Sequence, residues 1–210
     1  MNDKEFIETI VTRQFLEFKP LLLAHKRAKV ELNKAARKLD TFAKKYQFLN
    51  DILQVGANDD FLADKIKLLL KDAGFGKVIH YRDKRQKIKR EDIEAQHENE
   101  VFIIEIKGVN ASTPKKSDLT QVFSYLVENK KRRPDKNIYG LSIISHENKK
   151  NAQYRTISFF NEETNRDLIN MDIGSISALC LLILFKKLKA GEIEFEAFKN
   201  YLKQKGFIKI

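Results

Sequence analysis

The chain has almost no cysteine and no long apolar segment. Cys180 is its only cysteine among 210 residues, which excludes a disulfide framework and favours a reducing, intracellular setting. The longest wholly apolar run, at 178–185, is far shorter than the roughly 20 residues of a membrane-spanning helix. The N-terminus also lacks the basic segment followed by an apolar one that marks a signal peptide. We therefore expect a soluble, cytoplasmic protein with no membrane partner.

Several well-known site patterns are also missing. The chain has no Walker A motif, no zinc-ligand spacing and no nucleophile elbow. None of its four histidines has metal-like spacing: His25, His80, His97 and His146. Repeats and low-complexity linkers are absent as well. The sequence therefore does not support a P-loop, zinc or serine-hydrolase site.

The charge is strongly basic. The chain carries 40 Lys plus Arg against 29 Asp plus Glu, a formal net charge of +11. A positive field of this size favours a polyanionic partner, with nucleic acid as the first candidate. The alternative is a basic protein that binds no polyanion. An apolar content of 42% is enough for one ordinary folded domain, with room for an appendage.

Residues 1–57 show no strand-like alternation, and we predict a helical extension. Leu32, Leu39, Tyr46 and Leu53 recur every seven residues, which indicates a long amphipathic helix with an apolar seam. Pro20 predicts a break between this helix and an earlier one at about 4–18. The polar face of the second, longer helix is basic between residues 26 and 45. The seam either pairs with another subunit, as in a homodimer, or folds back on its own domain.

Residues 58–210 have the pattern of an α/β domain. An N-cap at Asp59 or Asp60 precedes an apolar helical stripe that stops at Gly74. Strands are predicted at 78–81, 91–96, 101–107, 138–145 and 154–160. Further helices are expected from Ser117 onward, at 175–189 and at 193–205. This order predicts a mixed central sheet flanked by helices.

The most informative stretch is VFIIEIKG at 101–108. Glu105 and Lys107 alternate on this apolar strand, so both point to the same side, and burying either alone would be costly. Asp92 lies on a short strand before it. Three other Glu-x-Lys tripeptides, beginning at 17, 128 and 147, lie in helix-like or loop-like contexts, so the strand context carries the signal. The alternative is an ordinary ion pair at a strand end.

These residue types suit phosphodiester hydrolysis. Such a reaction needs charge neutralisation at the phosphate and a hydroxide-like nucleophile, and Mg²⁺ or Mn²⁺ supplies both. Asp92 and Glu105 would be metal ligands, with the Ile106 backbone carbonyl as a further oxygen ligand. Lys107 would orient or help to deprotonate the attacking water and offset charge in the transition state.

Over about 59–185 the chain resembles the restriction-endonuclease-like superfamily, the PD-(D/E)xK nucleases. The match is to the sub-group with Gln-x-x-x-Tyr on the helix after the Glu-x-Lys strand, here Gln121 to Tyr125. The resemblance implies a restriction-endonuclease-like core and a Mg²⁺-dependent activity. It also implies that Gln121 lies near the metal and supports catalysis, and that Tyr125 lies near nucleic acid.

The chain departs from the family pattern in two places. The family often has a Glu early in the first core helix, and the matching position lies near Ala63; Asp64 or Asp60 would take its place as a metal ligand. No proline precedes Asp92. In addition, Glu94 shares the strand face of Asp92, so the upstream metal ligand is either of the two.

Two basic clusters flank this site in sequence and are predicted to hold phosphates, although solvated loops are the alternative. They comprise Arg82, Lys84, Arg85, Lys87, Lys89, Arg90, Lys130, Lys131, Arg132 and Arg133. We expect a metal-dependent nuclease acting on double-stranded DNA, of the restriction, repair or defence type, whose homodimer would present two active sites. The alternative is a catalytically weak or inactive nuclease-fold module that binds DNA or docks a partner in a larger complex.

Overall fold

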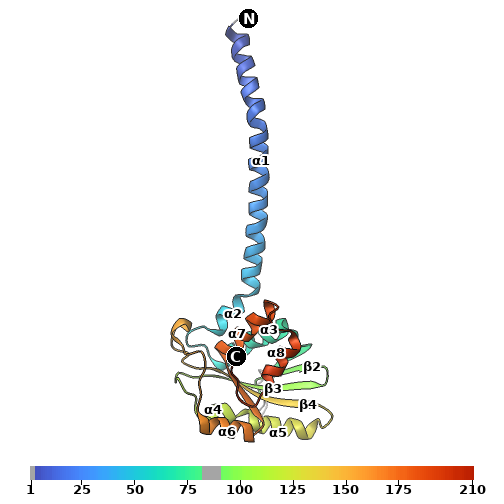
Figure 1. Cartoon of the computed structure of the whole chain (residues 1–210), viewed down its shortest axis with the longest axis vertical. Coiled ribbons are helices and arrows are strands. Elements are labelled where there is room, and N and C mark those ends of the chain that lie inside the picture. The colour runs from blue at the N-terminus through green and yellow to red at the C-terminus, as the bar shows by residue number, and fades with distance from the viewer. Residues whose placement is uncertain (1–2, 82–90) are drawn as a thin grey trace. The chain divides into compact units, whose positions relative to one another are not determined.

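The computed structural model describes residues 3–81 and 91–210, which divide into two compact units, 1–47 and 48–210. Most of the first unit is one helix, α1 (Asp3–Lys45) (Figure 1). The predicted break at Pro20 is wrong, because Pro20 lies inside α1. A proline costs about 3 kcal/mol inside a helix. Long flanking runs of Leu, Ala, Lys and Glu, which favour helix, keep α1 continuous.

The apolar seam of α1 is exposed where its side chains are described. Leu32 and Leu39 are each 69% exposed, and Phe42 is 61% exposed. The basic residues between 26 and 45 are exposed as well. An isolated amphipathic helix gains little stability without an apolar partner surface. Pairing of this seam with a second copy therefore stays a prediction.

The second unit is built on a six-stranded sheet with the strand order β1-β2-β3-β4-β5-β6. The strands are β1 (Lys77–His80), β2 (Ile93–His97), β3 (Glu100–Gly108), β4 (Asn137–Ser145), β5 (Ile173–Ser177) and β6 (Gly206–Phe207). Strands β1 to β3 are antiparallel, and β3 to β6 are parallel to one another. The predicted mixed sheet is confirmed.

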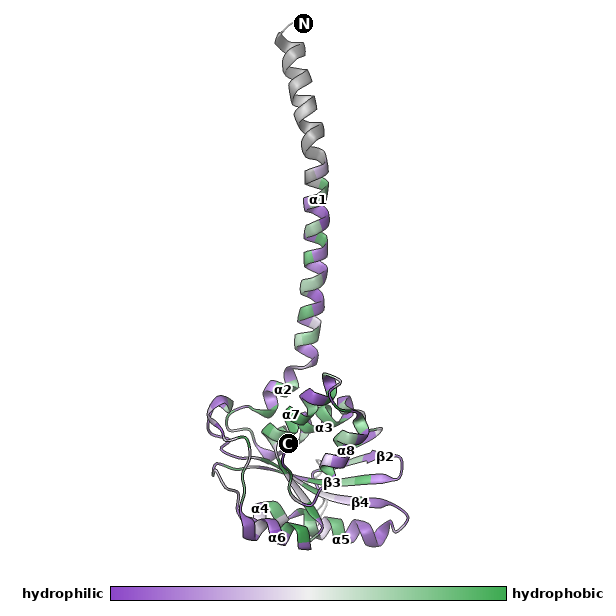
Figure 2. Ribbon diagram, in the orientation of Figure 1, coloured by the Kyte–Doolittle hydropathy of each residue, from purple (hydrophilic) through white to green (hydrophobic). Residues whose placement is uncertain are grey.

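Helices cover both faces of the sheet. On one face lie α4 (Lys116–Thr120), α5 (Val122–Arg132) and α6 (Glu162–Asn170); on the other lie α3 (Asp59–Ala73), α7 (Ala178–Lys189) and α8 (Phe195–Leu202) (Figure 1). A short helix α2 (Gln47–Ile52) and a 3-10 turn (Ala152–Tyr154) complete the chain. Apolar residues concentrate where these helices meet the sheet (Figure 2).

This layering explains the apolar run in β3. Val101 and Ile103 point to the α4–α5 side and pack in one core cluster with Leu126. Phe102 and Ile104 alternate with them, point to the opposite face and are fully buried. A strand covered on both faces is a continuous apolar run rather than an alternating one. Burial of each such side chain stabilises the fold by about 1.5–3 kcal/mol.

Two predictions from the sequence are wrong: the strand at 154–160 and the start of the helix at 175. The segment 154–160 is not a strand; its Phe159 packs edge-on against Phe207 and His146 instead. The next strand is β5, whose last three residues were predicted as the beginning of a helix at 175–189. Gly174 and Ser175 resemble helix-start residues, but in β5 they are buried between β4 and β6. Ser177 caps α7 by accepting the N–H of Cys180.

Two helix boundaries also differ from expectation. The N-cap of α3 is Asn58, whose Oδ1 accepts the N–H of Phe61 at 2.8 Å. Asp59 and Asp60 therefore occupy the first turn, where their negative charges interact favourably with the helix dipole. The helix expected from Ser117 begins at Lys116 and is divided into α4 and α5 at Gln121.

Candidate functional site

Two carboxylates lie side by side, one on the residue before β2 and one near the end of β3. Ile93 pairs with Ile104 across these antiparallel strands, so Asp92 lies opposite Glu105. The Oδ2 atom of Asp92 accepts the N–H of Ile106 at 2.8 Å. This bond fixes Asp92 against β3, beside Glu105 on the face covered by α4 and α5.

Glu105 is an unusually buried acid. It is 2% exposed, and its Oε2 makes no hydrogen bond within the described parts of the chain. Burial, and then the charge of Asp92, raise the pKa of Glu105 to about 7. Burial also raises the pKa of Asp92, although the Ile106 N–H and Lys107 act in the opposite direction. The positive charge near Asp92 and Glu105 is therefore too small to offset the burial and mutual repulsion of these two carboxylates.

Lys107 bridges this pair to helix α3. Its Nζ lies 3.3 Å from Glu105 Oε1 and 3.3 Å from Asp59 Oδ2. Burial alone would lower the pKa of Lys107, but the two carboxylates outweigh burial and raise it. The ammonium therefore stays protonated at neutral pH.

Asp59 is the site residue that sequence reasoning missed, because it was read only as a possible helix cap. Its Oδ1 accepts the Gly108 N–H at 2.7 Å while its Oδ2 holds Lys107, so it joins α3 to the end of β3. A Cβ on Gly108 would lie 2.7 Å from Asn148 Nδ2 and 3.0 Å from the Ala57 carbonyl oxygen, so a larger residue would crowd the end of β3. The sequence did offer one signal for Asp59, which is an acid in the first turn of the helix that precedes the two strands of the site.

Gln121 and Tyr125 differ in their surroundings. Gln121 is exposed at the junction of α4 and α5. Tyr125, expected on the polar face of its helix, is 7% exposed and belongs to the core cluster. Burial raises the pKa of the Tyr125 phenol, a hydrogen bond with Gln121 opposes this, and the charges of Glu105 and Asp92 add to it. The phenol is therefore near enough to the two carboxylates to respond to their charges.

Two acids considered as alternative metal ligands are engaged elsewhere. Asp64 Oδ1 lies 3.0 Å from Nδ1 of the buried His80. Both oxygens of Glu94 accept bonds of 2.9 Å from Arg133. Asp92 is thus the acid that lies opposite Glu105, and metal ligation by Asp64 or Glu94 stays a prediction. Coordination by the Ile106 carbonyl stays a prediction.

The predicted phosphate-binding residues are only partly described. Arg82, Lys84, Arg85, Lys87, Lys89 and Arg90 lie outside the described residues. In the second cluster, Lys130 pairs with Asp172, Arg132 with Glu128 and Arg133 with Glu94. Lys131 is exposed at the end of α5. These ion pairs lower the positive charge that the second cluster presents, and phosphate contact by it stays a prediction.

The chemistry of the carboxylate pair suits a divalent cation. Within residues 3–81 and 91–210, no group of three or more His, Cys, Asp or Glu side chains is arranged to hold a metal. Mg²⁺, however, commonly takes one or two carboxylates and completes its shell with water and phosphate oxygens. Asp92 and the unpartnered Oε2 of Glu105 match that donor set, since a bound cation would relieve their mutual repulsion.

No helix in the described part of the chain has the length and apolar content to cross a membrane.

Comparison with known proteins gives one informative likeness. No protein-family model matches the chain, and no curated protein matches its sequence. Among solved structures, the chain is similar to the small subunit of the heterodimeric restriction endonuclease R.BspD6I, with 13% identity and a TM-score of 0.52. The match covers 76% of this chain and 86% of that subunit. At this identity the likeness concerns the fold alone, and the sheet with its flanking helices is a restriction-endonuclease-like α/β fold.

Proposed function

We propose that this protein is a metal-dependent nuclease of the PD-(D/E)xK kind that hydrolyses phosphodiester bonds of DNA. The observation that carries the proposal is the arrangement at the end of β3. A buried Glu105 with an unpartnered oxygen lies beside Asp92, and a protonated Lys107 lies within 3.3 Å of Glu105. Perturbed acids beside a positioned cation are typical of catalytic sites.

Each residue has a role that follows from its surroundings. Mg²⁺ or Mn²⁺ held by Asp92 and Glu105 would neutralise phosphate charge and acidify a bound water. Because its pKa is raised, Lys107 acts as a hydrogen-bond donor that orients the water and stabilises charge on the phosphate. Asp59 positions Lys107 from the side of α3. Gln121, exposed at the junction of α4 and α5, is assigned a supporting role in catalysis.

The substrate assignment depends on charge and on the fold. The net charge of +11 favours a polyanion. A solved structure with a similar fold is a subunit of a restriction enzyme, which supports double-stranded DNA as substrate and a cytoplasmic role in restriction, repair or defence. The exposed seam of α1 supports a homodimer, which would present two sites for cutting both strands.

One observation favours a second candidate, a nuclease-fold module that binds DNA or a partner with little or no catalysis. The Asp proposed to replace the family's first-helix Glu, Asp64, binds His80 instead of joining Asp92 and Glu105. In this case the carboxylate pair would bind metal weakly and the chain would act through DNA contacts alone.

A cleavage assay separates the two candidates. The full chain is incubated with duplex DNA, single-stranded DNA and RNA in Mg²⁺, Mn²⁺ or chelator. We expect metal-dependent cleavage of duplex DNA that falls at least about 100-fold in Lys107→Met. The matched control is Lys186→Met, which changes an exposed lysine on the opposite face of the sheet. Intact nucleic acids in every condition, together with salt-sensitive and metal-independent DNA binding, would support the binding module.

A further inference from the structure

More than half of the net positive charge of the chain lies on one segment of α1. Residues 26–45 hold eight Lys or Arg against two acids, Glu31 and Asp40, a net charge of +6 out of +11. Every residue of this segment is exposed. Hydrophilic and apolar residues alternate along it (Figure 2). The segment is therefore a strongly charged surface in contact with solvent.

The basic residues form a stripe along one side of the helix. Successive residues of an α-helix are about 100° apart around its axis. At this spacing, seven of the eight fall within an arc of about 120°, and Lys29 lies about 60° outside it. Glu31 and Asp40 also lie outside the arc, one on each side of it. The basic stripe comprises Lys26, Arg27, Lys34, Arg37, Lys38, Lys44 and Lys45.

The two acids neutralise the basic stripe only in part. Glu31 accepts from Lys34 at 2.7 Å and Asp40 accepts from Lys44 at 2.8 Å. These four side chains are at least 63% exposed, and ion pairs exposed to this degree contribute little in water. Lys34 also lies one turn from Lys38, and like charges at this spacing destabilise a helix. A bound polyanion would remove this repulsion.

The basic stripe and the apolar seam lie on opposite sides of α1. Leu32 and Leu39 are about 160° to 180° from the middle of the stripe around the helix axis. A homodimer that pairs the seam therefore leaves the stripe facing outward. A helix that inserts the seam into a membrane surface would turn the stripe away from the lipid headgroups. The arrangement thus favours a polyanion other than an anionic membrane.

The composition of the stripe favours a duplex over a single strand. Proteins that bind single strands combine positive charge with aromatic side chains on which bases stack. The arc of the stripe holds no Phe, Tyr or Trp, because Phe42 lies outside it. Residues 26–45 span about 29 Å of helix, a length over which duplex DNA carries about 17 phosphates. The stripe therefore matches a dense row of phosphates and has no platform for a base.

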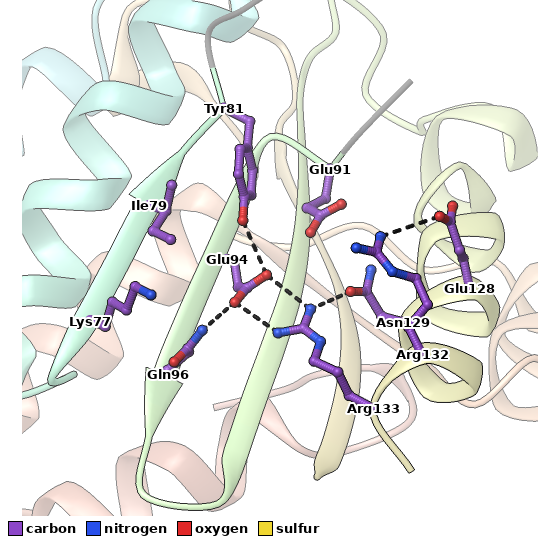
Figure 3. Close-up of a pocket in the computed structure, with 10 residues that line it drawn as sticks. All are labelled: Lys77, Ile79, Tyr81, Glu91, Glu94, Gln96, Glu128, Asn129, Arg132 and Arg133. Carbon is purple, nitrogen blue, oxygen red and sulfur yellow. Dashed lines mark hydrogen bonds and ion pairs between the residues drawn. The ribbon is translucent and has the colours of Figure 1, made fainter. Parts of the chain in front are cut away.

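The basic cluster at the end of α5 is more fully neutralised. Arg132 pairs with Glu128, and Arg133 donates to both oxygens of Glu94 (Figure 3). Lys130 pairs with Asp172. Each of these three cations has its own acid, whereas the seven cations of the basic stripe share the two acids of their segment. Of these two basic surfaces, the stripe on α1 is the better one for phosphates.

We propose that the basic stripe of α1 binds the phosphate backbone of duplex DNA, independently of sequence and of the metal site. The proposal rests on the nuclease function only in taking DNA as the duplex. Its Lys and Arg side chains replace counterions that are condensed on the phosphates, so binding weakens steeply as salt rises. Because α1 and the second unit belong to one chain, DNA held by the stripe is kept at a high local concentration for the second unit.

The first test measures DNA binding without metal or cleavage. The full chain in chelator is titrated over a series of salt concentrations with two duplexes of unrelated sequence and with one single strand of the same length, followed by fluorescence anisotropy. Co-sedimentation with vesicles of phosphatidylglycerol is measured beside it. We expect salt-sensitive binding of both duplexes with equal affinity and weaker binding of the single strand and the vesicles. Tighter binding of the single strand or of the vesicles than of the duplexes overturns the proposal.

A variant then locates the binding on α1. The combined variant Arg27→Gln, Arg37→Gln and Lys38→Gln removes three charges from the stripe. We expect it to weaken duplex binding by at least about 10-fold at about 0.1 M salt. The slope of log affinity against log salt is expected to become shallower by about 2.7, since each phosphate contact contributes about 0.9. Unchanged affinity and slope in this variant overturn the proposal.

The matched control removes the same charge elsewhere. The combined variant Lys71→Gln, Lys186→Gln and Lys187→Gln lowers the net charge by three on α3 and α7. It is expected to change duplex affinity by less than about 3-fold, because these lysines lie outside the stripe. An equal loss in the control and in the stripe variant reflects net charge alone and overturns the proposal.

A charge-conserving variant separates charge from shape. Arg27→Lys with Arg37→Lys keeps the positive charge of the stripe, so duplex affinity is expected to stay within about 2-fold of the wild type. Circular dichroism and light scattering check that helix content and oligomeric state match those of the wild type. A second set, Lys26→Gln, Lys34→Gln and Lys44→Gln, guards against one local disturbance and is also expected to weaken binding. A loss in the lysine variant as large as in the glutamine variant overturns contact through charge.

The binding titration and the cleavage assay fail independently. Duplex binding that depends on the stripe, without cleavage of any nucleic acid, refutes the nuclease function and keeps the stripe. Metal-dependent cleavage together with unchanged duplex binding in the stripe variant refutes the stripe and keeps the nuclease. Where both hold, the stripe variant is expected to cleave at low DNA concentration at least about 10-fold more slowly and to reach the wild-type rate at saturating DNA.

Discussion

The buried carboxylate of Glu105 makes a strong prediction about stability and pH. The pKa of Glu105 rises from 4.5 to about 7 on folding, first because of burial and then because of Asp92. In that interval the native state holds more protons than the unfolded state, so the free energy of unfolding falls as pH rises. At about 1.4 kcal/mol per pKa unit, the loss amounts to about 3 kcal/mol.

Glu105→Gln removes this titration while keeping the shape of the side chain. The free energy of unfolding of the variant relative to the wild type is expected to rise by about 3 kcal/mol between about pH 4.5 and pH 8. Urea unfolding in chelator at several pH values measures it, and taking the difference cancels the groups that both chains share. Glu192→Gln, at an exposed position after α7, is the matched control and is expected to show no such rise.

Bound metal is expected to reverse which protein is more stable, the wild type or Glu105→Gln. At a concentration about 100-fold above its dissociation constant, Mg²⁺ is expected to stabilise the wild type by about 2.7 kcal/mol at pH 8. Glu105→Gln is expected to gain little, because one of its two carboxylate ligands is lost. The reasoning is refuted if the stability of Glu105→Gln relative to wild type does not change with pH, or if Mg²⁺ stabilises both proteins equally.

Three further substitutions test other contacts. Arg133→Ala leaves Glu94 buried without its partner, so we expect a loss of about 3 kcal/mol in urea unfolding; a Glu94→Gln background should reduce this loss, and an unchanged loss would argue against the pair. Gly108→Ala is expected to lower the Tm by several degrees, because its Cβ would lie 2.7 Å from Asn148 Nδ2; an unaltered Tm would contradict this close approach. Arg155→Lys cannot match the fork that donates to Ser145 Oγ and four main-chain carbonyls, and a loss of about 2 kcal/mol is expected by the same method.

The strands of the site were predictable because their signal is local. The apolar run before Glu105 needs cover on both faces, and the short polar link between β2 and β3 indicates a hairpin. The sequence could not show that Asp59 holds Lys107, because that contact joins residues 48 positions apart. It also could not separate Asp92 from Glu94, since only the placement of Arg133 beyond α5 decides which acid is neutralised.

The misplaced elements have a common physical cause. In 154–160 the alternating apolar residues suggest a strand, but Ile157 and Phe160 are exposed and Phe159 is the only apolar residue of the segment that is buried. The last residues of β5 were predicted as the beginning of a helix, yet Gly174 allows the close approach of Gln204 and Ile208 that places the segment in the sheet. In both cases tertiary packing outweighs the local preference of the residues.

The sheet order bears on how the protein is made. Every strand pairs only with strands next to it in the chain, and a link of two residues joins β2 to β3. A polypeptide leaves the ribosome from its N-terminus, so β1, β2 and β3 emerge before β4 has been synthesised. Their pairing is between sequence neighbours, which is the kind that forms fastest. We therefore expect Asp92, just before β2, and Glu105 in β3 to meet early, and the parallel half of the sheet to be added to an edge that already carries them.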